Sequence, residues 1–521
     1  MTGRGRSPDE LVLAVDLGSS ALKLGVVSMA GEVHSFEERP LQTERLEGGG
    51  AVQDASAWWE LVLELSRSAL ASVDASRVAA VSCTSQWAST VPADEGGEPV
   101  GPCVMWLDTR GGPHAREVVG GPLMGYSPRA LALWIRLTAG IPSNQGGDPL
   151  AHMLLIEREM PGIAARARWY LEPVDYLTLR LTGRASATPA SMIGAWLTDN
   201  RHLDRLAYDR RLLRRTGLPA EKLAPLQATG SVIGPLRPEV ASALGLGPEV
   251  QVTTGIPDLH SAALGAGSIR EGEPHMPIGT TSWISLVTTR KKTDIQHSIA
   301  TVPGLDSRSY LVVNNHEAAG LALLWAREAL AAREPRSFGD LIADAADAPA
   351  GSGGVIFTPW IAGERSPVDD RGARGGWHNL SVETTNADLI RAVLEGVAYN
   401  SRWLHDAVEG FAGGRLDHLR IFGGGAVADL WCQIHADVMD RTIERVAEPL
   451  HTNLRGAGLF AGLILGAIER DQVRELVRVE RTFKPDPANH AAYERLYAEF
   501  PGLYKSQRKM FARLNDGAAP R

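Results

Sequence analysis

The stretch LVLAVDLGSSALKLGVV, residues 11–27, decides the fold. Its first five residues form a continuous apolar run, which is typical of a strand buried on both faces. Small residues follow Asp16, and a second apolar stretch, residues 24–27, resumes after them. A strand, a tight turn and a second strand predict a β-hairpin. The loops of Walker and dinucleotide-binding motifs differ, because they lead into a helix.

Helical and strand patterns alternate along the rest of the first half, which predicts an α/β fold. Apolar residues have helical spacing over 55–73, 131–137 and 152–159, and a buried strand is predicted over 78–83. A second half opens near Gly255 with a strand over 250–254. There PIGTTSWI, residues 277–284, places a Gly/Thr turn before a strand predicted over 283–287. Two similar turns in two halves indicate a duplicated nucleotide-binding architecture, with a boundary near residues 265–271.

The composition is that of a globular protein with two domains. The chain has 521 residues, of which 44% are hydrophobic and 22% charged, and this is too long for one core. The net charge of −8 comes without a Lys/Arg cluster, so no nucleic-acid partner is expected. Residues 1–10 lack the apolar stretch of a signal peptide, and the longest apolar run, 456–468, is too short to cross a bilayer. We therefore expect a cytoplasmic protein without a membrane partner.

The three cysteines, Cys83, Cys103 and Cys432, are odd in number, widely spaced and surrounded by apolar neighbours. This pattern favours reduced thiols in the core over a disulfide framework or a zinc site.

The first candidate site is the turn that follows the first strand, with Asp16, Gly18, Ser19, Ser20 and Lys23. Backbone N–H groups of small residues can approach phosphate oxygens closely. A carboxylate at the strand end can hold Mg²⁺, and a lysine adds a point charge. The alternative is an ordinary hairpin turn with a surface lysine.

The second candidate is GIPDLH, residues 255–260, in which Asp258 follows a strand and precedes a helix of small residues, 261–267. A carboxylate at the end of a strand, near a phosphate site, can accept the proton of an attacking alcohol. The alternative is that Asp258 caps the helix. His260 is interpreted as a packing residue, with a substrate contact as the other reading.

The third candidate is IFGGGA, residues 421–426, a strand that runs into three glycines before a helix over 429–439. Glycines allow a flat adenine ring to pack on bare backbone. Close packing between the helix and the strand is the alternative explanation.

In this order and at these distances, the motifs resemble those of the FGGY carbohydrate kinases. This family includes xylulokinase, gluconokinase, ribulokinase and glycerol kinase, and it belongs to the actin-like ATPase superfamily. The resemblance covers about residues 10–500. Further matching segments are WLDTR (106–110), DYLTLRLTG (175–183), PWIAGERSP (359–367), ARG (373–375), AVLEG (392–396), WCQIHAD (431–437) and RGAG (455–458).

The resemblance implies a two-domain actin-like ATPase fold of the ribonuclease H-like α/β class, with an ATP cleft between the domains. The N-terminal, sugar-binding domain would span residues 9–265 and the C-terminal, nucleotide-binding domain residues 266–500.

The resemblance also implies roles for individual residues. Asp258 would be the general base, and Asp16 would be a Mg²⁺ ligand assisted by Asp258. ATP would be held by Gly18, Ser19, Ser20, Lys23, Gly279, Thr280 and Thr281 at its phosphates, and by Gly424, Gly425, Ala426 and Asp429 at its adenosine. The substrate would be held by Gln86, Trp87, Trp106, Asp108, Arg110 and Asp258.

The chain departs from the family pattern at several positions. His152 and Leu155 stand where the family often has lysine and tryptophan, and Trp87 stands where sugar kinases commonly carry Met-His. Asn379 replaces a frequent glycine. The substrate is therefore left open among ketoses, sugar acids and polyols, with a ketose such as xylulose favoured.

The function predicted from the sequence is transfer of the γ-phosphoryl group of ATP to a hydroxyl of a small sugar. Two other hypotheses stay open. One is a nucleotide-switched binding protein like actin or a chaperone ATPase, and the other is a catalytically inactive regulatory relative. Asp258, together with the substrate-like Trp106, Asp108 and Arg110, favours the kinase. For the oligomeric state, a homodimer is one open alternative.

Overall fold

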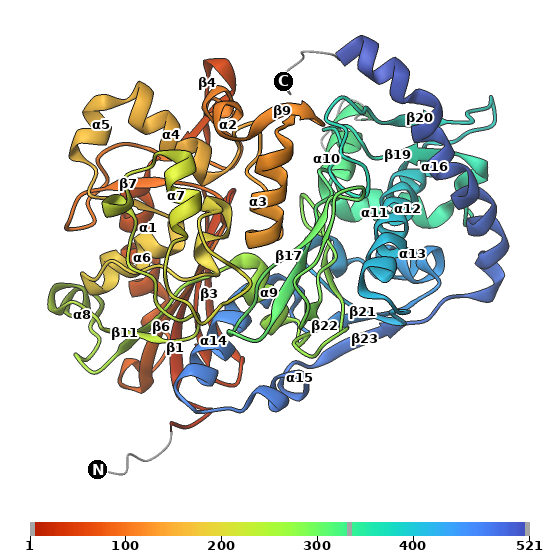
Figure 1. The fold of residues 1–521 in the computed structure, drawn as a ribbon. Helices are drawn as coiled ribbons and strands as arrows, with labels where there is room; N and C mark the ends of the chain where they lie inside the picture. The colour runs from red at the N-terminus through yellow and green to blue at the C-terminus, as the bar shows by residue number, and fades with distance from the viewer. Residues whose placement is uncertain (1–5, 331–335, 516–521) are drawn as a thin grey trace.

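The computed structural model describes residues 6–330 and 336–515, and the chain forms two lobes that each contain their own β-sheets (Figure 1). In the first lobe, β1 (Leu11–Leu17) pairs antiparallel with β2 (Ala21–Ser28), which confirms the predicted hairpin. The N–H of Gly18 donates to the carbonyl of Ala21 at 3.0 Å and closes the turn.

The first lobe is built on a seven-stranded mixed sheet. The order is β11-β12-β6-β1-β2-β3, and β13 also pairs with β6. Strands β1, β12 and β13 run parallel to β6, while β2, β3 and β11 are antiparallel to their neighbours. The other strands are β3 (Val33–Pro40), β6 (Val78–Ser85), β11 (Val232–Pro235), β12 (Gln251–Thr253) and β13 (Ile256–Pro257).

Helices and short strands complete this lobe. The helices are α1 (Ala55–Leu70), α2 (Gly112–Val119), α3 (Pro128–Thr138), α4 (Pro149–Glu159), α5 (Pro161–Arg166), α6 (Pro173–Thr182), α7 (Arg210–Thr216), α8 (Pro238–Leu244) and α9 (Asp258–Gly265). The short strands are β4 (Glu44–Leu46), β5 (Gly50–Gln53), β7 (Val91–Ala93), β8 (Cys103–Val104), β9 (Gly120–Leu123) and β10 (Trp169–Leu171). The predicted helices and strands of this half are confirmed, with ends displaced by up to three residues. Pro128 and Pro149 start their helices, since proline is favoured at the first helical position.

Both faces of β1 are covered, which explains its unbroken apolar run. Leu13 lies in the same core cluster as Trp58 of α1. The next residue, Ala14, points to the opposite face and packs with Ala457 of α14 (Thr452–Ile464). In Figure 1 this blue helix, from near the C-terminal end of the sequence, lies beside the red strands of the first lobe. The predicted boundary near residues 265–271 stays a prediction.

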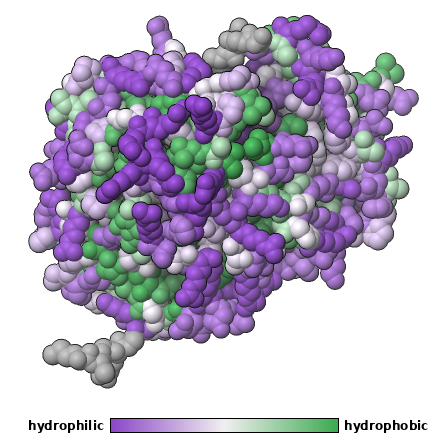
Figure 2. Space-filling view, viewed as in Figure 1, coloured by the Kyte–Doolittle hydropathy of each residue, from purple (hydrophilic) through white to green (hydrophobic). Residues whose placement is uncertain are grey.

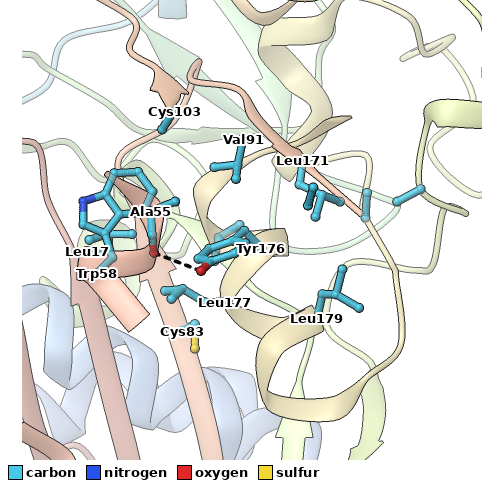
Figure 3. Close-up of a cluster of buried hydrophobic side chains, with 14 of the residues drawn as sticks. Leu17, Ala55, Trp58, Cys83, Val91, Cys103, Leu171, Tyr176, Leu177 and Leu179 are labelled. Atoms are coloured by element: carbon cyan, nitrogen blue, oxygen red, sulfur yellow. Dashed lines mark hydrogen bonds between the residues drawn. The ribbon is translucent and has the colours of Figure 1, made fainter. Parts of the chain in front are cut away.

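The core of the first lobe holds two of the three cysteines. Figure 3 shows Cys83 and Cys103 among buried apolar side chains, where the hydroxyl of Tyr176 donates to the carbonyl of Ala55 at 2.9 Å. Both thiols are free and buried, as is that of Cys432 in the second lobe. The prediction that the three cysteines lie in the core is confirmed.

The second lobe contains two four-stranded sheets and a long buried helix. One sheet has the order β14-β21-β22-β23 and the other β15-β18-β17-β16. Their strands are β14 (His275–Pro277), β15 (Val287–Thr288), β16 (Thr293–Asp294), β17 (Ile299–Pro303), β18 (Tyr310–Val313), β21 (His418–Phe422), β22 (Thr442–Val446) and β23 (Val479–Phe483), and β19 (Ile356–Thr358) pairs with β20 (Gly376–His378). The helices are α10 (Gly320–Ala329), α11 (Phe338–Asp347), α12 (Asn386–Ala412), α13 (Asp429–Met439), α15 (Val473–Leu476) and α16 (Pro487–Asn515).

The strand predicted over 283–287 is wrong for most of its length. Ser285 pairs with His275 beside one sheet, whereas Val287 belongs to β15 in the other sheet. The segment is apolar because it crosses between two sheets and is buried by both, and it therefore forms isolated bridges instead of one strand.

Hydrophilic residues cover most of the face shown in Figure 2, with hydrophobic residues between them. Within residues 6–330 and 336–515, no helix combines the length and the apolar character that crossing a bilayer requires.

Candidate active site

Parallel strand register brings Asp16 and Asp258 to the same end of the first sheet. Asp16 of β1 lies opposite Thr84 of β6, and Ile256 of β13 lies opposite the same Thr84 from the other side. Asp258 comes two residues after Ile256. Because neighbouring strands lie about 4.8 Å apart, the backbone positions of Asp16 and Ile256 lie about 10 Å apart, and Asp258 follows just beyond the strand end. The side chains of Asp16 and Asp258 can therefore meet at one ligand.

The surroundings of Asp258 bring the pKa of its carboxyl close to neutral. Burial raises the pKa of its carboxyl to about 7, and the charge of Asp16 adds to this effect. The N–H of Leu259 donates to Asp258 Oδ1 at 2.8 Å and lowers the pKa in part. A carboxyl group with this pKa can act as a general base at physiological pH.

Asp258 is the first residue of α9, and its side chain does not cap the helix. Pro257 holds the cap position, and within residues 6–330 and 336–515 the Asp258 carboxylate accepts from the N–H of its neighbour Leu259 alone. The helix is held against the sheet by a 2.9 Å hydrogen bond between the hydroxyls of Thr84 and Ser261. Capping therefore does not account for this aspartate.

Asp16 faces the side of the sheet that α14 covers. Burial raises the pKa of its carboxyl, while Lys23, opposite in the hairpin, and Asn453 of α14 act in the other direction. Asn453 Nδ2 donates to Asp16 Oδ2 at 3.4 Å. Among the described residues, Asp16 Oδ1 and Asn453 Oδ1 are buried without a partner. Two unsatisfied oxygens of this kind match the oxygen ligands that Mg²⁺ prefers.

The sequence did not point to Asn453. It lies just before the apolar run 456–468, which has the pattern of a plain core helix. Its partner in space is 437 residues away along the chain. Helices α14 and α9 approach closely because residue 456 is glycine. A Cβ on Gly456 of α14 would lie 1.9 Å from the carbonyl oxygen of Ser261 in α9.

The first turn presents two serines in different directions. Ser20 is exposed, and its carbonyl accepts from the N–H of Leu41 at 2.8 Å. The hydroxyl of Ser19 instead contacts Gln86 and Trp106, at 2.8 and 2.9 Å. Of the residues predicted to hold phosphate, Ser19 thus directs its side chain to residues predicted to hold the substrate.

The second turn, residues 279–281, is fixed to the start of α10. The N–H groups of Ala319 and Leu321 donate to the carbonyl of Thr280, at 3.0 and 3.1 Å, and that of Gly320 donates to Gly279 at 2.7 Å. A Cβ on Gly320 would lie 2.6 Å from the Gly279 oxygen, so this contact requires glycine. The helix N-terminus therefore holds the turn in place, and Thr280 stays exposed.

The three glycines after β21 have different surroundings. A Cβ on Gly425 would lie 2.3 Å from Ile278 Cγ2, so close packing accounts for this glycine. A Cβ on Gly424 would meet nothing within 4 Å, which leaves its backbone open to a ligand. Ala426 is buried, and Asp429 forms ion pairs with two arginines of neighbouring strands, Arg445 and Arg481.

Among the predicted substrate residues, Asp108 is fully occupied within the protein. It is 0% exposed, and its carboxylate accepts from the N–H of Ala51 at 2.9 Å and from the Arg110 guanidinium at 2.6 Å. The Asp108 carboxylate is thus used to orient Arg110, which is partly exposed.

Trp87 lies half-buried on a cluster that includes Ile193 and Leu259, the neighbour of Asp258. The loop that carries it is anchored by Glu172, whose Oε2 accepts from the N–H of Ser89 at 3.3 Å. Between them, Ala88 has a φ of 62°, an uncommon value for a residue with a side chain. Glu172 was also missed from the sequence.

The two histidines considered in the sequence are buried. His260 is 0% exposed and its Nε2 lies 2.8 Å from the carbonyl oxygen of Pro303, so packing and hydrogen bonding account for it. Burial lowers the pKa of His152 to about 4, which leaves the ring neutral beside Thr90.

Comparisons with known proteins cover nearly the whole chain. The sequence profile described as the FGGY family of carbohydrate kinases, N-terminal domain, matches residues 11–265, and that of the C-terminal domain matches residues 276–464. A xylulose kinase of Staphylococcus epidermidis is 27% identical over 513 residues, 97% of this chain and 98% of the relative. A gluconokinase of Bacillus subtilis is 25% identical over 494 residues, 93% of each.

The fold matches solved structures equally widely. A ligand-bound xylulose kinase from Lactobacillus acidophilus superposes with a TM-score of 0.85 at 22% identity, over 96% of this chain and 99% of that one. The likeness establishes the fold, and the predicted two-domain actin-like ATPase architecture is confirmed.

Proposed function

Since the chain belongs to the FGGY family of carbohydrate kinases and is an ATP-dependent alcohol phosphotransferase, we propose that its acceptor is a ketose, with xylulose favoured, and that Asp258 is its general base. The base assignment rests on one observation: Asp16 and Asp258 lie at the same end of the first sheet, on either side of β6. Because the chain belongs to a family of carbohydrate kinases, the hypothesis of a nucleotide-switched binding protein is dropped.

The reaction proposed is an in-line displacement at the γ-phosphorus. The Asp258 carboxylate accepts the proton of the sugar hydroxyl, the hydroxyl oxygen forms the new P–O bond, and the bond to the β-phosphate oxygen breaks to release ADP. The pKa of about 7 supports this role, because a carboxylate with that pKa takes up the proton more readily than an ordinary aspartate. Burial of the site limits water as a competing acceptor.

Mg²⁺ would neutralise charge on the phosphates, and its proposed protein ligand is Asp16, assisted by Asp258. The unpartnered Asp16 Oδ1 supports this assignment. Asn453 would orient the Asp16 carboxylate by donating a hydrogen bond to the second carboxylate oxygen, Asp16 Oδ2. Lys23 limits the cost of burying a negative charge at this position.

The nucleotide would lie between the two turns, with its phosphates at residues 18–20 and 279–281 and its adenosine near Gly424. The fixed second turn and the open face of Gly424 support this placement. Gly425, Ala426 and Asp429 would shape the adenosine pocket through the packing and ion pairs described above.

The preference for a ketose rests on the relatives, since several that match over nearly their full length are named xylulose kinase. Gluconate and glycerol are the other acceptors that the names of relatives suggest. Gln86, Trp87, Trp106 and Arg110 would contact the sugar. We place the activity in the cytoplasm, which suits ATP use and three free thiols.

An acceptor screen tests the proposal. The purified protein with Mg-ATP is offered ketoses, aldonates and polyols, and both ADP and sugar phosphate are measured. We expect one ADP for each sugar phosphate and the highest kcat/KM with xylulose. A higher kcat/KM for gluconate or glycerol would refute the ketose assignment, and no turnover with any acceptor would indicate an inactive regulatory relative.

A further inference from the structure

The hydroxyl of Ser19 forms two hydrogen bonds whose direction is fixed by chemistry. Trp106 Nε1 lies 2.9 Å from Ser19 Oγ, and an indole nitrogen is only a donor, so the serine oxygen accepts there. The single hydroxyl proton is then donated to Gln86 Oε1 at 2.8 Å. Both hydrogen bonds therefore point the same way: Trp106 donates to Ser19, and Ser19 donates to Gln86.

This direction determines which groups Gln86 has left for a ligand. Its carbonyl oxygen is occupied by Ser19, so its amide N–H donors are the free groups. Among the described residues, the side-chain amide donates to Met105 Sδ at 3.9 Å, and a thioether is a weak acceptor. Gln86 itself is buried and its main-chain N–H donates to Leu17 at 2.7 Å, so the side chain has little freedom. A sugar oxygen that accepts a hydrogen bond is the complementary ligand.

The same bonds define what Trp106 offers. The N–H of its indole is used by Ser19, so the side chain presents a ring surface and no free donor. The ring is half-buried and suits the C–H face of a sugar.

The main chain of Ser19 is held from behind by a second series of bonds. Gln53 Nε2 donates to the Ser19 carbonyl at 2.8 Å, and Gln53 Oε1 accepts from Trp58 Nε1 at 3.0 Å. Trp58 is fully buried in α1. Ser19 is therefore anchored to the core, and its side chain cannot turn to the phosphates without breaking both hydroxyl bonds.

We propose that Ser19, although it belongs to the phosphate turn, is a positioning residue for the sugar. It orients the Gln86 amide so that its N–H groups meet an acceptor oxygen of the substrate. This inference rests on the proposed function. It assigns to Ser19 a role different from that of its neighbour Ser20, whose side chain is exposed and forms no hydrogen bond with the described residues.

The test compares Ser19→Ala, Ser19→Thr and Ser20→Ala in the coupled ADP assay with the sugar on which the wild type is most active. Loss of the Ser19 hydroxyl should raise the KM for that sugar about five- to tenfold and leave the KM for ATP within about twofold. Threonine keeps the hydroxyl and should restore most of the sugar KM. Ser20→Ala should act on the KM for ATP instead.

Deoxy analogues of the same sugar sharpen the result. The analogue that lacks the oxygen facing Gln86 should show no further loss in Ser19→Ala, since the two changes remove the same interaction. A rise in the KM for ATP with an unchanged KM for sugar would overturn the inference and leave the proposed function intact. A wild type without activity on any acceptor would refute the proposed function, and the inference with it.

Discussion

Replacement of Asp258 by asparagine should abolish turnover and at the same time stabilise the protein. The carboxyl has a pKa of about 7 in the folded chain and 3.8 ordinarily, so the folded state is destabilised whenever this group is ionised. The difference corresponds to at most about 4 kcal/mol. Asparagine has a similar shape and no charge, so this cost disappears.

The pH window follows from the two pKa values. Below pH 3.8 the carboxyl is neutral in both states, and asparagine brings no gain. As the pH rises from about 4 to 7, the unfolded chain ionises first and the wild type loses stability relative to Asp258→Asn. Above pH 7 the difference in unfolding free energy between Asp258→Asn and the wild type stays at its maximum. The turnover of the wild type should rise over the same range, because the base must be deprotonated.

Thermal unfolding at pH 5 and pH 8, without nucleotide or Mg²⁺, measures the gain in stability. The ADP assay measures the loss of turnover. We expect a higher Tm for the variant, with the larger gap at pH 8, and a kcat lower by at least about 10²-fold. Asp175→Asn is the matched control, because burial also raises the pKa of Asp175, to about 8, but it should retain activity. Equal Tm gaps at both pH values, or a variant that keeps its turnover, would refute the reasoning.

Three further substitutions test other parts of the site. Asn453→Ala should raise the Mg²⁺ concentration needed for half-maximal activity several-fold and weaken Mn²⁺ binding measured by electron paramagnetic resonance with ADP present. An unchanged metal requirement would contradict the role given to Asn453. Glu172→Leu removes the acceptor that anchors the loop of Trp87 and should raise the sugar KM, whereas Glu172→Gln should restore it, and identical values for both variants would exclude this anchoring. Gly425→Ala should lower unfolding stability by about 1–3 kcal/mol through overlap with Ile278, while Gly424→Ala should not, as denaturant titration would show.

The sequence was sufficient where local pattern and chemistry agree. The apolar run before Asp16 is typical of a strand buried on both faces, and the small residues after it favour a tight turn. Asp258 was singled out because a carboxylate at the end of a strand, near a phosphate site, can accept the proton of an alcohol, and the resemblance to the FGGY kinases made it the general base. These signals lie within a few neighbouring residues.

Other features required the fold. Asn453 and Glu172 act on residues far away in the sequence, and neither has a local pattern that separates it from an ordinary helix or loop residue. Ser19 had the right composition for a phosphate turn, but the direction of its hydroxyl depends on Trp106, 87 residues away. The failed strand over 283–287 has a similar cause, since apolar content records burial and does not record which sheet provides it.

The packing of α14 against β1, β2 and β6 bears on how the protein is made. During synthesis, the ribosome releases the first sheet hundreds of residues before it releases the helix that covers one of its faces. Until residue 464 has emerged, side chains such as Val12 and Ala14 have no permanent cover. A fragment that stops at residue 265 would expose this surface, and such nascent chains should depend on chaperones and aggregate when expressed alone.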